Sequence, residues 1–493
     1  MRLIIVKDRE EGCRLAARYF AHMLYKNPNA VFGLATGSSP IPLYRLLSTY
    51  HKSGWKDAMT FNLDEYVGVA KDDETSYHAF MHTHLFDNID IQPHNIHLLD
   101  SHSSPDDLCQ YEEDIKTAGG IDLQLLGIGQ NGHIGFNEPG SSFESTTRLV
   151  DLTPSTLEAN KDALSTKNHP TQAFTMGIQT ILNAREICVL AWGSSKAKAC
   201  FDALIGPMTT DVPASVLCLH EKCMWILDED AASLISQHDR TRMCVWNTMA
   251  LCDRGLHCVV FSPHPDDDVI AMGATISRLA EHHHVTIVYQ TSGFRGIPTC
   301  SRDEATLIRQ GEARAAVDKL GSNITTVFLN SPFYELKQAP SHEDVDLHID
   351  LLERLKPDVV FAAGDYGDPH GTHEKCTGVL LEALHSKQCT SKGITEGVHH
   401  VPREVWLYKG AWEEWNIDEV DLIIPYDEEC AARKKQSILC HASQTVPAFA
   451  GTDIRPFWQR ADDRCKAHAD QVNKRINNYP FHRVETFRLH RFL

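Results

Sequence analysis

A glycine-rich loop directly after an apolar run decides the fold of the first half of this chain. The loop reads Gly129-Gln130-Asn131-Gly132-His133-Ile134-Gly135-Phe136-Asn137-Glu138-Pro139 and follows residues 121–128, whose apolar character predicts a buried strand. Its glycines predict a tight exit from the sheet. In open α/β sheets, ligands bind at the C-terminal ends of the strands. The pattern therefore predicts an α/β sheet with a candidate site on this loop.

Three polar side chains on the loop suit proton transfer. They are the amide of Asn131, the imidazole of His133 and the carboxylate of Glu138. A carboxylate can orient a nearby histidine and keep it ready to shuttle a proton near neutral pH. Taken singly, each residue also fits a structural turn, but their combination on a strand-end loop favours a catalytic role.

The composition is that of a globular protein with more than one domain. A length of 493 residues is too long for one ordinary core, so two domains are the first expectation. A net charge of −19 argues against nucleic acid or an anionic membrane as the main partner, whereas an anionic small molecule would need a local basic pocket.

Cysteine usage and the apolar runs indicate the compartment. The 15 cysteines form no Cys-x-x-Cys pair, which predicts reduced thiols in a cytoplasmic protein. The N-terminus turns polar after one short strand and so does not resemble a signal peptide. No apolar run approaches the roughly 20 residues of a membrane-spanning helix, so no membrane association is expected. A homo-oligomer is compatible with the sequence.

Other strand ends of the first half also carry polar residues. Residues 36–40 form a hydroxyl-rich turn before a helix, which suits an anion, although an N-cap at Ser39 before Pro40 explains the same residues and is favoured when they are taken alone. Residues 59–63 form an apolar strand that ends on the acids Asp64 and Glu65. After a strand at 186–192, Lys196 stands at a helix start, where it is either solvated or a phosphate clamp.

Residues 1 to about 235 resemble the glucosamine-6-phosphate deaminase family. The matching strings are 35–40, 61–68, 129–139 and 193–197. The resemblance implies that Asp64 moves a proton between C2 and C1 of the opened sugar. It implies that His133 opens the pyranose ring with the support of Asn131 and Glu138, and that no metal is needed. It also implies a substrate-binding set made of Thr36, Gly37, Ser38, Ser39, Arg148 and Lys196.

Two segments depart from the pattern of that family. Residues 156–162 lack the arginine that many relatives use to bind phosphate, and Lys161 is the alternative. Val150 and Asp151 stand where allosteric relatives carry a basic cluster, so allosteric activation is not expected.

A second α/β pattern begins at His257 and carries a candidate metal site. One strand, 258–261, ends at His264, Asp266 and Asp267, and another, 359–363, is followed by a histidine-bearing turn at 370–373. Two histidines and one carboxylate with an open position are typical of a catalytic zinc, and Asp266 would then be free to act as general base. The triple histidine at 282–284 is a rival metal candidate, but consecutive side chains point apart, so a surface location is expected.

Residues 256 to about 445 resemble the zinc-dependent N-acetylglucosamine deacetylases. The matching strings are 264–267, 309–313, 369–373, 434–436 and 440–444. The resemblance implies that Zn²⁺ is bound by His264, Asp267 and His373. It also implies that Asp266 is the base and that His370 steadies the oxyanion. Relatives often carry an acid where this chain has Phe294-Arg295, and Arg295 offers a cation for a sugar phosphate.

Together these patterns predict an α/β protein of two domains, each a mainly parallel Rossmann-like sheet flanked by helices. The expected boundaries are 1–238 for the deaminase-like domain, 239–255 for a linker, and 256–493 for the deacetylase-like domain with a helical C-terminal tail. The favoured function is a bifunctional enzyme that deacetylates N-acetylglucosamine 6-phosphate and then deaminates the product to fructose 6-phosphate and ammonia. The alternatives are a deaminase whose second domain acts on another N-acetylated sugar, and a regulator that only binds sugar phosphates.

Overall fold

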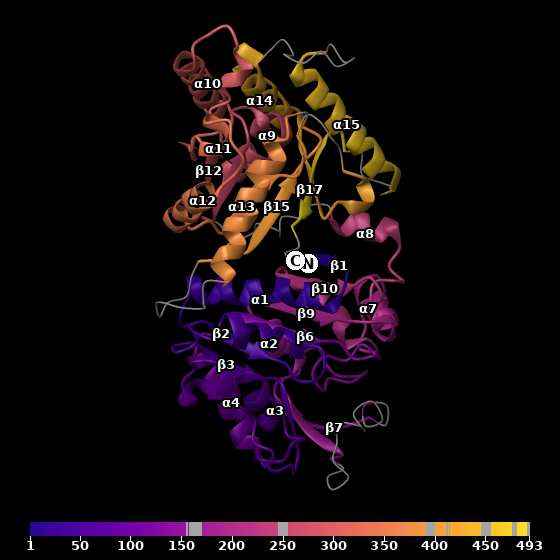
Figure 1. Ribbon diagram of the computed structural model, residues 1–493. Helices are drawn as coiled ribbons and strands as arrows, with labels where there is room; N and C mark the ends of the chain where they lie inside the picture. The colour runs from indigo at the N-terminus through magenta and orange to yellow at the C-terminus, as the bar shows by residue number, and fades with distance from the viewer. Residues whose placement is uncertain are drawn as a thin grey trace. The chain divides into compact units, whose positions relative to one another are not determined.

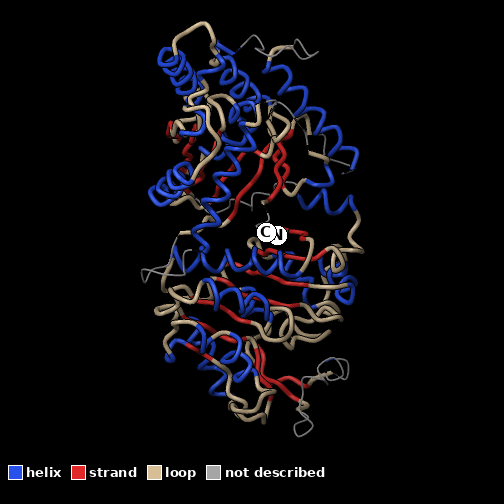
Figure 2. Tube along the Cα trace, viewed as in Figure 1, coloured by secondary structure: helices blue, strands red, loops and turns tan. Residues whose placement is uncertain are grey.

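The chain forms two compact α/β units in a computed structural model (Figure 1). The structure describes residues 1–153, 156, 170–244, 255–368, 370–389, 400–410, 413, 415–444, 455–475 and 481–490. The first unit spans Met1–Ser236, and the second begins at Gln237. Each unit is built around its own sheet, as Figure 2 shows. Two α/β domains with mainly parallel sheets were expected, and this is confirmed.

A seven-stranded parallel sheet is the centre of the first unit. Its order is β1-β10-β9-β6-β2-β3-β5, and every adjacent pair is parallel. In chain order the strands are β1 (Arg2–Val6), β2 (Val31–Leu34), β3 (Met59–Asn62), β5 (Ile96–His97), β6 (Leu123–Gly127), β9 (Glu186–Ala191) and β10 (Cys223–Asp228). The chain leaves the central β2 toward β3 and β5, then returns to β6 on the other side. The topological switch point therefore lies between β2 and β6.

The helices of the first unit are α1 (Arg9–Lys26), α2 (Ile41–Tyr50), α3 (Tyr77–His84), α4 (Pro105–Thr117), α6 (Ile178–Leu182) and α7 (Ala197–Leu204). Local capping explains where they begin. Asp8 accepts the backbone N–H of Glu11 at the start of α1, and Ser104 with Asp107 forms a capping box at α4. The apolar faces of these helices cover strands such as β2, whose four residues are all buried.

A small antiparallel sheet, which was not predicted, lies beside the glycine-rich loop at 129–139. It has the order β4-β8-β7, with β4 (Asp64–Tyr66), β7 (Arg148–Asp151) and β8 (Gln172–Thr175). Asp64 therefore begins a new strand rather than a loop, and pairs with Thr175. Tyr66 packs in a buried cluster with Phe136, which holds the end of the glycine-rich loop against this sheet.

The second unit is a seven-stranded mixed sheet with the order β13-β12-β11-β14-β15-β17-β16. Its strands are β11 (His257–Ser262), β12 (His284–Tyr289), β13 (Ile324–Phe328), β14 (Val359–Ala363), β15 (Glu404–Tyr408), β16 (Leu422–Pro425) and β17 (Val484–Leu489). The pairs from β13 to β15 are parallel, whereas β17 is antiparallel to both β15 and β16. From β11 the chain continues to β12 and β13 on one side, and it then returns to β14 on the other side. The switch point therefore lies between β11 and β14.

The helices of the second unit are α8 (Gln237–Cys244), α9 (Asp267–Ala280), α10 (Arg302–Val317), α11 (Pro332–Glu335), α12 (His342–Leu355), α13 (Thr372–Cys389), α14 (Glu428–Leu439) and α15 (Phe457–Arg475). Residues 239–244 of the expected linker at 239–255 belong to α8, and Gly255 lies in a turn before β11. Residues 245–254 lie outside the described residues. No helix in the described ranges is long and apolar enough to span a membrane.

The expectation of a helical C-terminal tail is only half right. Helix α15 is present, but β17 follows it and lies inside the sheet. The charged residues of β17 concealed it, since a buried Glu485 is not expected in a strand. Its carboxylate is 2.6 Å from the Nζ of the equally buried Lys434 of α14, and it also accepts hydrogen bonds from Thr275 of α9. Because the partner charge comes from a distant helix, the local pattern does not show that Glu485 is neutralised.

Candidate active sites

The predicted loops of the first half come from four neighbouring strands. Residues 36–39 follow β2, residues 129–139 follow β6, Lys196 follows β9, and Asp64 follows β3. In the sheet these strands are consecutive, in the order β9-β6-β2-β3, and all are parallel. Their C-terminal ends therefore share one edge, on both sides of the switch point.

Asp64 is a buried carboxylate with a strongly perturbed pKa. Only 6% of its surface is exposed, and Thr36 Oγ1 lies 3.5 Å from its Oδ1. Burial, followed by the negative charge of Glu65, raises the pKa of Asp64 to about 8. A carboxyl group that loses its proton close to neutral pH can accept one during a reaction, which suits a general base.

Asn131, His133 and Glu138 meet as the sequence predicts. Asn131 Nδ2 donates to Glu138 Oε2 at 2.8 Å, and the backbone N–H of His133 donates to Asn131 Oδ1 at 3.2 Å. His133 Nδ1 lies 3.5 Å from the same Glu138 oxygen. Burial raises the pKa of Glu138, but the hydrogen bonds to its carboxylate outweigh burial and lower that pKa to about 2. Glu138 is therefore ionised at neutral pH, and its carboxylate faces the ring of His133.

Thr156 is a site residue to which the sequence analysis gave no role. Its hydroxyl donates a short hydrogen bond to Glu138 Oε1. The two oxygens of Glu138 are thus held separately, one by Thr156 and one by Asn131. No local pattern marks Thr156, because the contact joins positions 18 residues apart, with β7 between them.

Two glycines let the loop approach the reacting side chains. A Cβ on Gly129 would lie 2.3 Å from the ring of His133, so this position has room only for glycine. Gly135 has a φ of 56°, and a Cβ there would lie 2.9 Å from Thr175 Oγ1 and 3.5 Å from Asp64 Oδ2. The loop therefore passes directly beside Asp64.

The expected phosphate-binding residues differ in their contacts. Trp192 Nε1 donates to the carbonyl of Ser39 at 3.1 Å, which ties the hydroxyl loop to the end of β9. Lys196 is partly buried, which lowers its pKa, and it makes no ion pair with any described residue.

Arg148 instead donates to Asn137 Oδ1 at 2.8 Å and to Ser141 Oγ at 3.3 Å, so it braces the glycine-rich loop. Lys161 lies outside the described residues.

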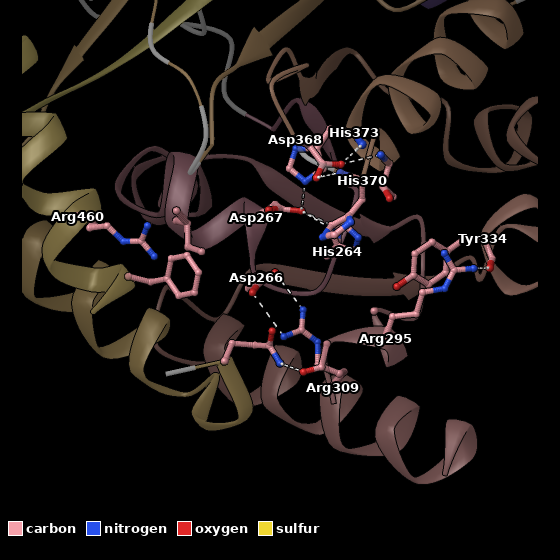
Figure 3. A pocket seen from close by; sticks show the side chains of 16 residues that line it. His264, Asp266, Asp267, Arg295, Arg309, Tyr334, Asp368, His370, His373 and Arg460 are labelled. Carbon is pink, nitrogen blue, oxygen red and sulfur yellow. Dashed lines mark hydrogen bonds and ion pairs between the residues drawn. The ribbon is translucent and has the colours of Figure 1, made fainter. Parts of the chain in front are cut away.

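The second unit brings the three predicted metal ligands together across its switch point. His264 and Asp267 follow β11, and His373 lies in the first turn of α13, after β14. Asp267 Oδ2 lies 3.1 Å from His264 Nδ1 and 3.2 Å from His373 Nε2. Figure 3 shows the three side chains converging at one wall of a pocket. They are the only cluster of its kind among the residues that the structure describes.

This cluster fits a zinc ion. Two ligands about 2.1 Å from a tetrahedral zinc stand roughly 3.4 Å apart, close to the two separations in the cluster. Two imidazoles and one carboxylate are also a common catalytic donor set. Although burial lowers the pKa of His373, the charge of Asp267 outweighs burial and raises that pKa to about 9. Without a metal, the protonated ring of His373 neutralises the charge of Asp267. A bound metal cation would neutralise that charge instead.

Asp266, the expected general base, is paired with Arg309. The Nη2 of Arg309 lies 3.1 Å from Asp266 Oδ1, and Nη1 lies 3.5 Å from Oδ2. Arg309 is 2% exposed, and it reaches Asp266 from α10. Arg309 belongs to a string that matches the deacetylases, but its role could not be predicted, because the contact depends on which face α10 turns toward β11.

A cavity of about 310 Å³ opens over this cluster. Besides the ligands and Asp266, its lining includes Arg295, Arg309, Tyr334, His370 and Arg460. Arg295 donates to the carbonyl of Tyr334 at 2.5 Å, and its guanidinium lies 4.2 Å from the centroid of that ring. Arg295 has no carboxylate partner among the described residues. Figure 3 shows Arg295 and Arg460 on opposite sides of the cluster.

The rival histidines at 282–284 do not form a metal site in the described structure. His282 is exposed, but His283 is buried, which corrects the expectation of a surface location for the whole run. The carbonyl of His283 accepts a hydrogen bond from Asn323, and His284 begins β12.

Comparison with known proteins matches each half of the chain to a family. Residues 9–225 match the family described as glucosamine-6-phosphate isomerases/6-phosphogluconolactonase. A glucosamine-6-phosphate deaminase-like protein of Bacteroides thetaiotaomicron is 31% identical over an alignment of 607 positions that covers 94% of this chain and 91% of that protein. The chain belongs to the glucosamine-6-phosphate deaminase family. Its C-terminal half carries a second domain, since residues 259–384 match the GlcNAc-PI de-N-acetylase family.

Other relatives of the deaminase family match the first unit alone. A glucosamine-6-phosphate deaminase of Thermoanaerobacter sp. is 44% identical over 245 residues, which cover 48% of this chain and 97% of that enzyme. A solved structure of a monomeric glucosamine-6-phosphate deaminase is 41% identical and covers 48% of this chain and all of that one, with a TM-score of 0.46. The chain is thus an amino-sugar enzyme with one deaminase-like and one deacetylase-like domain.

Proposed function

We propose that the chain catalyses two consecutive reactions on amino-sugar phosphates. The second unit removes acetate from N-acetylglucosamine 6-phosphate, and the first converts the resulting glucosamine 6-phosphate into fructose 6-phosphate and ammonia. The observation that carries the proposal is that one chain holds both the buried Asp64 beside the His133–Glu138 pair and the His264–Asp267–His373 cluster. The amine that an N-deacetylase releases is the group that a deaminase needs.

In the first unit, the chain's own residues supply the proton transfers. His133, held by Glu138 and Asn131, protonates the ring oxygen and opens the pyranose. Asp64 then takes the proton from C2 and returns it at C1, so that the nitrogen leaves as ammonia after hydration. The raised pKa of Asp64 matches this role, because a carboxylate with a pKa near the working pH both accepts and returns a proton.

This assignment predicts a pH dependence for deamination. Only ionised Asp64 can act as the base, and its pKa of about 8 means that the ionised fraction grows as the pH rises through 8. We expect kcat/KM for glucosamine 6-phosphate to rise between pH 6.5 and 8.5. Thr36→Val removes a hydrogen bond that lowers the pKa of Asp64, so the midpoint should move to higher pH. An identical profile in the parent and in Thr36→Val would contradict the assignment.

Lys196 and the 36–39 loop are proposed to hold the 6-phosphate. Lys196→Ala should raise KM for glucosamine 6-phosphate by about 10- to 150-fold, since a hydrogen bond to a charged group contributes about 1.5–3 kcal/mol. Lys198→Ala is the matched control, because Lys198 is exposed and pairs with Asp202. Equal KM values for the two variants would move the phosphate site elsewhere, with Lys161 the next candidate.

In the second unit, His264, Asp267 and His373 are proposed to hold Zn²⁺. When bound there, zinc supplies a Lewis acid that polarises the amide carbonyl and makes a water nucleophilic near neutral pH. Asp266 accepts the proton of the attacking water and passes it to the leaving nitrogen, while Arg309 fixes the orientation of Asp266. His370 is proposed to stabilise the negative charge on the carbonyl oxygen, and Arg295 to contact the sugar phosphate.

A single assay separates the proposed function from its alternatives. The zinc-loaded chain is incubated with N-acetylglucosamine 6-phosphate, and acetate and ammonia are measured together. We expect both products, with acetate appearing first. Ammonia from glucosamine 6-phosphate but no acetate from its acetylated form would mean that the second domain acts on another N-acetylated sugar. No product from either sugar would favour a binding protein without catalysis.

A further inference from the structure

A second cavity adjoins the pocket of the second unit behind Asp266. It has a volume of about 200 Å³, and we call it the annex. Four residues line both spaces, namely Asp266, Ile270, Gln444 and Phe457. The remaining lining of the annex consists of Ile438, Leu439, His441, Pro456 and Trp458. The annex therefore adjoins the pocket at Asp266, the proposed base.

The two cavities differ in chemical character. The main pocket presents charged and polar side chains, among them Arg295, Arg309 and Asp368. The annex beyond the shared wall is lined by aliphatic and aromatic side chains, with one polar exception, His441. A ligand with one polar and one apolar part fits this division only with its polar part in the main pocket.

The imidazole of His441 is buried without a hydrogen-bond partner among the described residues. It is 2% exposed, and neither ring nitrogen has a partner among the residues described. Burial lowers the pKa of His441 to about 4, so the ring is neutral. A neutral imidazole offers one N–H donor and one acceptor nitrogen, and leaving such groups buried and unpaired is unfavourable. A hydroxyl group can satisfy either nitrogen.

The position of the reacting carbonyl assigns an occupant to the annex. In the proposed amide hydrolysis, on which this inference rests, the carbonyl carbon lies between Asp266 and the His264–Asp267–His373 cluster. Its two substituents are the sugar nitrogen and the acyl chain. The polar sugar suits the main pocket, which leaves the annex to the acyl chain. About 200 Å³ is far more than a methyl group needs, since one water occupies roughly 30 Å³.

We propose that the annex is an acyl subsite that accepts hydroxyacyl groups larger than acetyl, with His441 hydrogen-bonded to the acyl hydroxyl. The smallest such substrate is an N-glycolyl amino-sugar phosphate. Its hydrolysis forms a bond between the water oxygen and the carbonyl carbon and breaks the C–N bond. The water proton passes through Asp266 to the nitrogen, so glycolate and the free amine are released.

The test compares three amides of glucosamine 6-phosphate with the full-length, zinc-loaded chain. N-glycolyl and N-propionyl groups have the same number of non-hydrogen atoms and differ by one hydroxyl, while N-acetyl reports the basic reaction. We expect N-glycolyl to be hydrolysed with a kcat/KM about 2- to 12-fold higher than N-propionyl, the range that one net hydrogen bond provides.

Variants of His441 then show whether this residue is the cause. His441→Phe should reduce the glycolyl-to-propionyl ratio to about one, and His441→Gln, which keeps a donor and an acceptor, should retain part of it. His342→Phe makes the same substitution at an exposed histidine of the same unit and should keep the parent ratio. An unchanged ratio in His441→Phe, or hydrolysis of the N-acetyl substrate alone, would overturn the acyl subsite. Failure to hydrolyse all three amides would overturn the proposed deacetylation as well.

Discussion

Replacing His264 with alanine should abolish acetate release from N-acetylglucosamine 6-phosphate and leave ammonia release from glucosamine 6-phosphate intact. His264 is one of three proposed ligands, and its Nδ1 lies 3.1 Å from Asp267 Oδ2. Losing one of three protein ligands removes most of the metal affinity. Because a catalytic metal contributes several kcal/mol, acetate release should fall by about a thousandfold or more.

Two comparisons make this result specific to the metal. Chelation of the parent should reproduce the His264→Ala phenotype, and added zinc should restore the chelated parent but not the variant. The control is His282→Ala, which removes an exposed histidine from the same unit. Bound zinc is measured alongside both products. If chelation stopped the two reactions equally, or neither of them, the proposed division of work between the two units would be wrong.

Asp64→Asn should reduce deamination by about 10²- to 10⁴-fold, the usual contribution of a general acid–base group. The substitution nearly preserves the shape of the side chain but removes its basicity. The buried position and the raised pKa of Asp64 suit a base, and an amide at this position cannot accept the C2 proton. The measurement is ammonia release from glucosamine 6-phosphate.

The same variant also tests the order of the reactions. With N-acetylglucosamine 6-phosphate, Asp64→Asn should still release acetate, so glucosamine 6-phosphate should accumulate. Asp72→Asn provides the matched control, because Asp72 is exposed on a neighbouring turn. Ammonia release within threefold of the parent would show that Asp64 is not the base.

The two sheets could be predicted because their central strands are buried on both faces. Strands such as β2 and β11 form short, continuous apolar runs, and each is followed by polar residues at the sheet edge. Strand order then places those polar residues near one another, which explains why loops far apart in sequence could be assigned to one site. Six strands were missed, and all are short or carry charged residues: β4, β5, β7, β8, β16 and β17.

The side-chain contacts within the sites could not be predicted in the same way. The pairing of Arg309 with Asp266 depends on the rotation of α10 against the sheet, and the bond from Thr156 to Glu138 joins positions 18 residues apart on either side of β7. The resemblance implied a substrate-binding role for Arg148, and it could not show that the guanidinium donates hydrogen bonds to Asn137 and Ser141. Such contacts follow from three-dimensional packing, which local sequence patterns do not encode.

The place of β17 between β15 and β16 determines when the second sheet can form during translation. All strands of the first sheet are available once β10 has left the ribosome, because β10 is its last strand in the chain and pairs with β1 and β9. The second sheet has no partner for β16, and an open edge at β15, until residues 484–489 emerge. Domains fold as units in the order of synthesis, and open edges invite aggregation. In a nascent chain, the first sheet therefore has all its strands while the second still has an open edge at β15 and an unpaired β16.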